Sequence, residues 1–290
     1  MNAARYYEAD VLILGGDLTG KGLVPMVRIP GGAKGYFRGK EYVLASNEDL
    51  TKFEKMIAMS GYYTHNASLD EIDELKANPS RLDTIFIELM KQRIREWIKF
   101  ADERLQGTDV KIYVCPGNDD VFEIDELFGE SSTIINASDM VTSVDDHHEM
   151  LNVGWANPTP WHTHRECSEE ELAKKIEAQV TQLKDVKNSI FQLHAPPYES
   201  LLDTAPKLDE SLKMVYGESV SAGSTAVRNA IEKYQPLLGL HGHIHESDGA
   251  IKIGRTLCVN PGSAYVEGVL QGVVVNLDKS SVRSHYSITG

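Results

Sequence analysis

The sequence predicts an α/β protein, and two observations support this fold class. Short apolar runs of strand length alternate with longer stretches in which apolar residues recur every three to five positions, as in helices with one buried side. Four of the short runs end in Asp, Asn or His. The carboxyl ends of parallel strands meet along one edge of such a sheet, so we expect these polar side chains to come together there.

Composition and charge narrow the class of protein. The chain has 290 residues, of which 41% are hydrophobic and 25% charged, enough to bury a large core. Its 43 acidic and 29 basic residues give a formal net charge of -14. This balance argues against non-specific nucleic-acid binding, because holding a phosphate backbone requires clustered Lys and Arg. A bound cation could still attract a phosphate group.

The cysteines and the apolar runs bear on the cell compartment. Cys115, Cys167 and Cys258 form no CxxC pair, which indicates neither a disulfide framework nor a cysteine zinc site. The N-terminus lacks an apolar core of signal-peptide length, and no run approaches the roughly 18 apolar residues of a membrane helix. We therefore predict a cytoplasmic protein with no membrane partner.

The first apolar run, within "ADVLILGGDLTGKGL" at 9–23, can be interpreted in two ways. Its GxxxxGK core matches a nucleotide-binding loop, but that loop needs Ser or Thr after Lys21 and then a helix. Gly22 follows Lys21, and Pro25 comes soon after. The carboxylate of Asp17 would also repel phosphate oxygens unless a cation stood between them. We favour a turn that holds a metal; the alternative, an ATPase, would bind nucleotide through Lys21.

Residues 21–80 depart from the regular pattern. The stretch "RIPGGAKGYFRGKEYVL" is typical of a hairpin with glycine turns. We interpret this region as an insertion or cap within a single domain spanning residues 1–290. Beyond it, helices are expected from Ser80 and from Ser168, where Glu171 completes a capping box.

Three further strands carry candidate ligands at their ends. They run into "CPGNDD", "LHAPP" and "LHGHIHES", and the polar side chains there are Asn118, Asp119, His194, His241, His243 and His245. An aspartate can bridge two divalent cations, imidazole suits Zn, Fe, Ni and Mn, and an amide oxygen adds no negative charge. Two such ions about 3.5–4 Å apart lower the pKa of a bridging water and hold phosphoryl oxygens during in-line attack. Taken alone, His194 fits a structural histidine equally well.

The ordered motifs resemble those of the calcineurin-like metallophosphoesterase superfamily. They are Asp17 in "GGD", Asn118 in "GND", His194 in "LHAPP", and His243 with His245 in "GHIH". The resemblance spans most of the chain and implies two facing mixed β-sheets flanked by helices, with a dinuclear centre of divalent metal ions such as Mn, Fe, Zn or Ni. By the same resemblance, Asp17 bridges the two ions and His245 belongs to one of them. The other ion is completed by Asn118, His194 and His243.

Two departures from the family pattern matter. The family begins with a strand ending in DxH, whose Asp and His ligate the same ion as His245, and no such motif precedes Asp17 here. We therefore expect the chain to begin inside the domain and the ion at His245 to be weakly held or absent. Asp119 stands where the family usually has a histidine that is thought to protonate the leaving group, and an ionised carboxylate cannot donate that proton. The role of Asp119 stays open.

Other histidines are candidates for the missing proton donor. We consider His241, His162 and His164. The segment "NPTPWHTHREC", which carries the last two, is either a wall of the substrate mouth or a rigid proline-rich connection. The stretch 209–224, between two ligand motifs, is expected to be a mobile loop at the rim of the site.

The resemblance implies a metal-dependent phosphoesterase that hydrolyses a small phosphomonoester or phosphodiester with a metal-activated hydroxide. The alternative is a metal-binding or regulatory protein of the same fold with little or no turnover, because the DxH motif is missing and Asp119 replaces the usual histidine. A domain without its first strand would leave strand edges unpaired, which favours a homo-oligomer.

Overall fold

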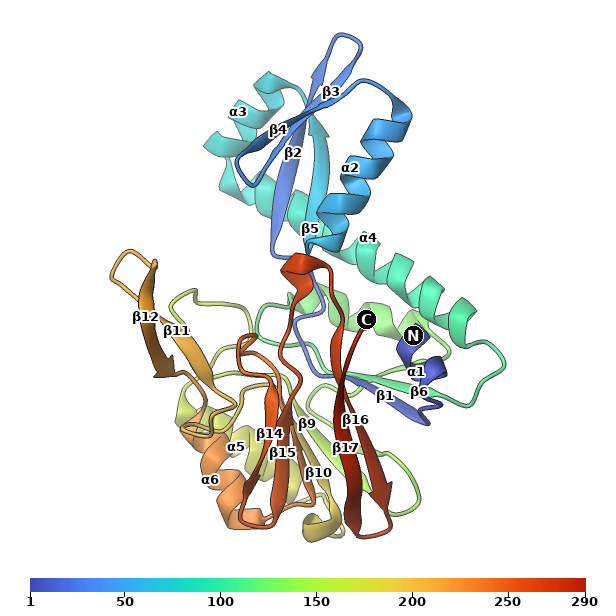
Figure 1. Cartoon of the computed structure of the whole chain (residues 1–290), viewed down its shortest axis with the longest axis vertical. Coiled ribbons are helices and arrows are strands. Elements are labelled where there is room, and N and C mark those ends of the chain that lie inside the picture. The colour runs from blue at the N-terminus through green and yellow to red at the C-terminus, as the bar shows by residue number, and fades with distance from the viewer. The chain divides into compact units, whose positions relative to one another are not determined.

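The chain forms two compact units, and Figure 1 labels most of their helices and strands. The computed structural model describes residues 1–290. The first unit comprises Met1–Leu18, Ile98–Ala264 and Leu270–Gly290, and the second comprises Thr19–Trp97 and Tyr265–Val269. The irregular region expected at 21–80 lies within the second unit, and its status as an insertion into one domain of residues 1–290 stays a prediction.

Two sheets form the frame of the first unit. The smaller sheet is wholly parallel, in the order β1 (Val11–Leu14), β6 (Lys111–Val114) and β7 (Ile134–Asn136). The larger sheet has the order β14 (Gly249–Ile253), β15 (Thr256–Asn260), β13 (Leu238–Leu240), β10 (Ile190–Leu193), β9 (Glu149–Val153) and β8 (Val141–Ser143). Its four inner strands are parallel, and the edge strands β14 and β8 are antiparallel to their neighbours. Two hairpins, β11 (Thr204–Leu208) with β12 (Met214–Ser221) and β16 (Gln271–Asp278) with β17 (Ser281–Thr289), complete the strands.

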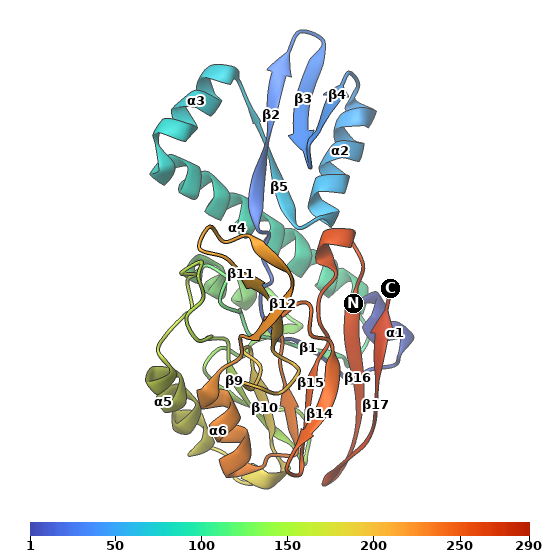
Figure 2. The ribbon, with the colours of Figure 1, turned by 60° about the vertical axis from the view of Figure 1, so that its left-hand side comes forward.

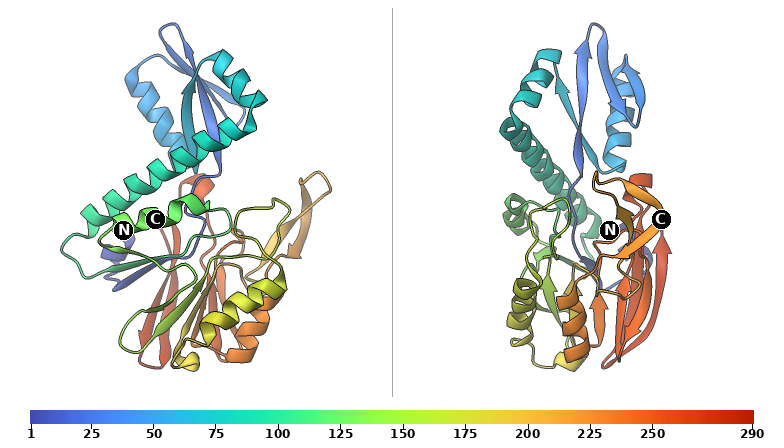
Figure 3. Two further views of the ribbon diagram at one scale, coloured as in Figure 1. Left: turned by 180° about the vertical axis from the view of Figure 1, so that it is seen from behind. Right: turned by 90° about the vertical axis from the view of Figure 1, so that its left-hand side faces the viewer.

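The core of the first unit lies on both faces of the six-stranded sheet. One face packs against side chains of β1, β6 and the β16–β17 hairpin, and the layer includes Val11, Ile13, Tyr113, Met150, Ile190, Leu238, Val259, Val275 and Leu277. The other face is covered by α5 (Glu169–Val180) and α6 (Thr225–Tyr234), as Figure 3 shows. The predicted α/β sandwich of sheets and helices is therefore confirmed, with the smaller sheet parallel rather than mixed.

Two of the strands that lead to the ligand motifs, β6 and β10, are buried on both faces. All four residues of β10 are buried, as are the last three residues of β6. Strands covered on both sides have continuous apolar sequences instead of alternating ones. This burial explains the short uninterrupted apolar runs that precede Asn118 and His194 in the sequence.

Side-chain caps stabilise the N-termini of α5 and α6, the two helices that cover one face of the six-stranded sheet. Ser168 caps α5 as expected, its hydroxyl accepting a hydrogen bond from the Glu171 amide at 3.2 Å, but the predicted capping box is incomplete because the Glu171 carboxylate does not return a bond to the Ser168 amide. Ser224 caps α6. The carboxylate of Glu169, in the first turn of α5, accepts from the first two amides of α6 at 3.0 and 2.8 Å. A negative charge at a helix N-terminus is stabilising, so this contact ties the two helices together.

The expectation of a loop throughout 209–224 is wrong, whereas its mobility and its place at the rim of the site stay predictions. Half of this stretch is strand β12, which pairs with β11 in an antiparallel register that places Ala205 opposite Val220 and shifts between Pro206 and Leu208. Gly and Ser in the stretch suggested a loop. Cross-strand pairing outweighs local composition because the backbone groups of each strand satisfy those of the other.

The second unit is a four-stranded sheet with helices on both faces (Figure 2). The strand order is β4 (Lys40–Leu44), β3 (Gly32–Phe37), β2 (Gly22–Ile29) and β5 (Tyr62–Ala67), so the predicted glycine-turn hairpin is confirmed. Helix α2 (Asn47–Met59) packs Phe53 and Ile57 on one face. On the other side, the ring of Tyr63 lies 5.7 Å from that of Phe86 in α4 (Pro79–Leu105). The unit also holds α3 (Leu69–Ala77) and the short η3 (Tyr265–Glu267).

The remaining elements are short, apart from α4, which continues from the second unit into the first. They are α1 (Asn2–Tyr6), η1 (Phe122–Glu130) and η2 (Val186–Asn188). The helix expected from Ser80 begins one residue earlier, and Ile94 and Ala101 of its apolar stripe are buried. Not one of the helices has both the length and the apolar character that crossing a membrane requires.

Gly154 offers a direct test of how β9 meets the "CPGNDD" loop. A Cβ at this position would collide with the backbone carbonyl of Pro116, which cannot move without displacing the loop. We expect Gly154→Ala to lower the free energy of unfolding by about 1–3 kcal/mol, the usual range for an overpacked site, measured by urea denaturation. Gly129→Ala is the matched control, because its Cβ meets nothing within 4 Å. An equal effect of the two substitutions would contradict this account.

Candidate metal centre

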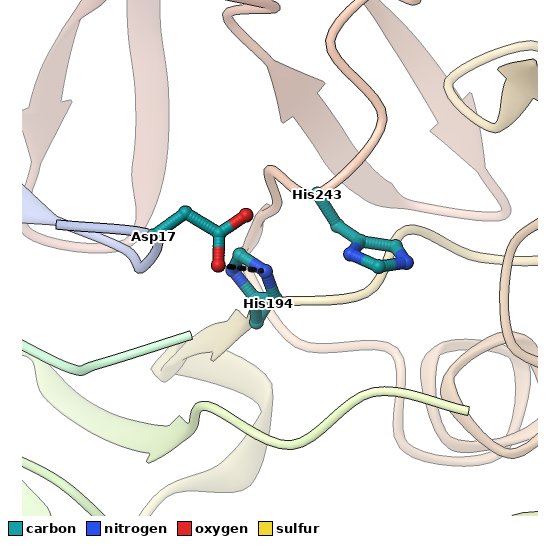
Figure 4. A group of neighbouring side chains, drawn as sticks. All are labelled: Asp17, His194 and His243. Atoms are coloured by element: carbon teal, nitrogen blue, oxygen red, sulfur yellow. Dashed lines mark ion pairs between the residues drawn. The ribbon is translucent and has the colours of Figure 1, made fainter. Parts of the chain in front are cut away.

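Four strand ends of the first unit bring their polar side chains to one place. β1 and β6 are parallel neighbours in one sheet, and β10 and β13 are parallel neighbours in the other. The residues that follow them include Asp17, Asn118, His194 and His243. One ligand atom each of Asp17, His194 and His243 lies within 4.8 Å of the others. Figure 4 shows these three side chains around a common point.

His194 is the buried centre of the group, with 1% of its surface exposed. Its Nδ1 lies 2.8 Å from the carbonyl oxygen of Gly15. A carbonyl oxygen only accepts hydrogen bonds, so Nδ1 carries the ring hydrogen and the neutral ring has its lone pair on Nε2. This Nε2 faces Asn118 Oδ1 at 2.9 Å and Asp17 Oδ1 at 3.4 Å.

The amide oxygen of Asn118 lies close to both His194 and His243. It lies 2.7 Å from Nδ1 of His243 as well as 2.9 Å from Nε2 of His194. Asn118 is 3% exposed, and its amide nitrogen donates to Thr163 Oγ1 at 2.8 Å. The oxygen therefore points toward the two histidines and the nitrogen away from them.

The atoms that meet in this arrangement fit a divalent cation. With His194 neutral, its Nε2, the oxygen of Asn118 and the carboxylate of Asp17 are all acceptors that face one another without a hydrogen between them. Either a proton or a metal ion can occupy such a point. Burial lowers the pKa of His194, but the Asp17 carboxylate and the Gly15 carbonyl outweigh it and raise the pKa above its usual value. Oxygen and imidazole donors in this combination suit Mn, Fe, Zn and Ni.

His245 lies on the other side of Asp17. Its Nε2 is 4.0 Å from Asp17 Oδ2, whereas His194 faces Oδ1 of the same carboxylate. His245 is also more open to solvent, with 30% of its side chain exposed. The two oxygens of Asp17 thus face different histidines, an arrangement in which one carboxylate can contact two cations.

The candidates for catalytic roles, Asp119, His241 and His164, differ in their burial and hydrogen-bond partners. The backbone amide of Asp119 donates to Asp17 Oδ1 at 3.1 Å, so this residue helps to orient the carboxylate. His241 is buried, its Nδ1 lying against the carbonyls of Leu193 and Ala195, and burial lowers its pKa to about 4. His162 and His164 are exposed at the surface. No hydrogen bond joins His241, His162 or His164 to the side chains of Asp17, Asn118 or His194.

Asp120 is a functional residue that sequence reasoning missed. Its buried carboxylate accepts from the amide of Gly117 at 2.7 Å and from that of Leu18 at 3.0 Å. It therefore joins the turn of Asp17 to the turn of Asn118. The doubled acid in "GNDD" was the available signal, but only its first member was considered.

A glycine makes the close approach of these turns geometrically allowed. Gly16 has φ of 129°, a region that L side chains rarely adopt, and a Cβ there would collide with the ring of His194. Asp17 and His243 also have positive φ values, 52° and 66°. Non-glycine residues in this region cost free energy and cluster at functional sites.

The chain is similar to an archaeal protein over much of its length. It is 32% identical over 184 residues to the uncharacterized protein MJ1162 of Methanocaldococcus jannaschii, a match that covers 61% of this chain and 77% of that protein. No protein-family model matches the sequence.

Two solved structures share only distant similarity with the chain. TT1561 of Thermus thermophilus has a TM-score of 0.45 and 19% identity, covering 69% of this chain and 79% of that one. The sulfate thiohydrolase SoxB of Thermus thermophilus has a TM-score of 0.33 and 12% identity, covering 67% of this chain and 41% of that one. These likenesses are too low to bear on fold or function.

Replacing Asp120 tests whether it holds the two turns together. Asp120→Ala leaves the amides of Gly117 and Leu18 without their charged acceptor, and hydrogen bonds to charged groups contribute about 1.5–3 kcal/mol. We expect a loss of that size in the free energy of unfolding, measured by urea denaturation. Asp146→Ala, which removes an exposed carboxylate, is the control and should change stability by less than about 0.5 kcal/mol. A loss no greater than that of the control would contradict the bridging role.

Proposed function

The chain belongs to the same family as the uncharacterized protein MJ1162 of Methanocaldococcus jannaschii, and we propose that it is a metal-dependent phosphoesterase. The name of that relative states no activity, so the proposal rests on the site itself and on the resemblance of its motifs to those of metallophosphoesterases. The substrate would be a small phosphomonoester or phosphodiester.

One observation carries the proposal: the carboxylate of Asp17, the amide oxygen of Asn118 and Nε2 of His194 converge on one point, and all three are acceptors when His194 is neutral. Asn118, His194 and His243 with Asp17 would hold one cation, and Asp17 with His245 would face a second. When bound, such ions neutralise phosphate oxygens and lower the pKa of water. The donor set suits Mn, Fe, Zn or Ni, and the metal identity belongs to the proposal.

Bound cations would also offset the negative charge of the protein near the site. An anionic substrate would be repelled by a chain of formal net charge -14. Asp17 brings negative charge to the site, whereas Asn118 supplies an oxygen without adding more. A phosphate group is therefore attracted only where cations locally reverse the sign of the field. Four further expectations stay predictions. The protein binds neither membranes nor, non-specifically, nucleic acid; it forms a homo-oligomer; and it is cytoplasmic.

A second candidate function has a specific observation in its favour. No hydrogen bond joins His241, His162 or His164 to the group around His194, and the backbone amide of Asp119 donates to Asp17. The structure therefore orients none of the candidate imidazoles at the cluster through a hydrogen bond. A metal-binding or regulatory protein with little turnover would need no such group.

The test of the main proposal is metal content together with hydrolysis. We expect the purified protein to bind Mn²⁺ and to hydrolyse bis(p-nitrophenyl) phosphate or p-nitrophenyl phosphate. His194→Ala removes a buried ligand and should weaken Mn²⁺ binding and lower turnover by more than the 10–100-fold typical of outer-shell substitutions. His285→Ala, an exposed histidine on β17, is the control and should leave both unchanged.

The two functions give different results in this experiment. Mn²⁺ binding that depends on His194, without turnover of either ester, would favour the regulatory alternative. A protein that binds no divalent metal would exclude both. Hydrolysis that survives His194→Ala would show that the activity arises elsewhere in the preparation or the chain.

A further inference from the structure

We propose that Thr163, held in place by Glu166, is a positioning residue that keeps the amide oxygen of Asn118 turned toward His194 and His243. In this role it sets the metal affinity of the candidate centre without touching the metal. The inference rests on the proposed function, since it assumes that the cluster binds a cation.

The amide of Asn118 has two ends of opposite polarity and nearly equal size. Its oxygen can contact a cation, whereas its NH₂ group would place two hydrogens toward the positive charge. Rotation by half a turn exchanges the two ends. A ligand asparagine therefore needs something outside the metal site that accepts a hydrogen bond from its nitrogen and refuses its oxygen.

The hydroxyl of Thr163 has this selectivity because its single hydrogen is already committed. Thr163 Oγ1 donates to Glu166 Oε1 at 2.5 Å, and the backbone amide of Thr163 donates to the same Oε1 at 2.9 Å. Only the lone pairs of Oγ1 remain for Asn118, whose Nδ2 donates to it at 2.8 Å. The direction of hydrogen bonding thus runs from the amide through the hydroxyl to the carboxylate.

Glu166 is suited to be the end of this chain of hydrogen bonds. It also accepts from the amide of Thr159 at 2.9 Å and from the hydroxyl of Thr159 at 2.5 Å. Burial opposes ionisation, but the hydrogen bonds from the two threonines outweigh it and lower the pKa of Glu166 below its usual value. The group is therefore a carboxylate at neutral pH, which can only accept hydrogen bonds.

Arg165 fixes this segment against the loop that carries Asn118. Its amide donates to the carbonyl oxygen of Asn118 at 3.2 Å. Its buried guanidinium donates to the carbonyl of Asp120 at 3.1 Å and to the carboxylate of Asp125 at 2.6 Å. Thr163 is thus held at a defined distance from Asn118 by main chain and side chain together. This assigns a role to "NPTPWHTHREC" that neither a substrate wall nor a plain connection would require.

The experiment compares three threonine variants of the full chain by their affinity for Mn²⁺, measured by isothermal titration calorimetry. Thr163→Val keeps the shape but removes the nearer acceptor of Asn118 Nδ2, at 2.8 Å, and leaves only Asp119 Oδ1 at 3.4 Å, so we expect Mn²⁺ to bind about 10–100-fold more weakly. Thr163→Ser restores the hydroxyl and should restore the affinity. Thr159→Val is the matched control: it removes a hydroxyl bonded to the same carboxylate oxygen without touching Asn118, and should bind Mn²⁺ like the wild type.

Each outcome decides between distinct conclusions. Wild-type affinity in Thr163→Val, or an equal loss in Thr159→Val, would overturn the positioning role while leaving the proposed function intact. Failure of the wild type itself to bind Mn²⁺ would overturn the proposed function, and the inference with it. If Thr163→Val does not fold, Glu166→Gln replaces it, because its NH₂ can donate to Thr163 and reverse the chain; weaker Mn²⁺ binding would then support the role and unchanged binding would overturn it.

Discussion

Acceptor atoms from different strand ends face one another around His194, and this is the constraint on which the rest of the first unit depends. Nε2 of His194, the oxygen of Asn118 and the carboxylate of Asp17 carry like partial charges at 2.9 and 3.4 Å. Such an arrangement is unfavourable unless a cation or proton lies among them, so rigid groups must hold each atom in place. The carbonyl of Gly15 does this for the histidine.

The supports of the cluster are buried or partly buried hydrogen bonds between loops. Asp120 joins the turns that carry Asp17 and Asn118. The segment around Glu166 contributes Thr163, whose hydroxyl accepts from the amide nitrogen of Asn118. Hydrogen bonds in partly buried surroundings compete less with solvent than exposed ones, so these contacts help to keep the ligands arranged.

Much of the fold and the central part of the site could be predicted from particular residues. Continuous apolar runs ending in Asp17, Asn118 and His194 predicted parallel strands with convergent ends, because strands buried on both faces cannot alternate polar and apolar residues. Ser168 marked the start of α5 through its capping preference. The stretch 209–224 was misread, because hairpin pairing between β11 and β12 depends on a partner strand that local composition does not reveal.

Burial patterns and ligand chemistry are local properties of the chain, so the fold class and the converging residues can be predicted without coordinates. The neighbours that support those residues are visible only in the folded protein. Asp120 and Thr163 act across 102 and 45 positions of sequence, and His241, which stands beside the motif, turns instead to the carbonyls of β10 and the residues after it. The direction of a side chain depends on contacts between distant segments, and spacing along the chain does not specify them.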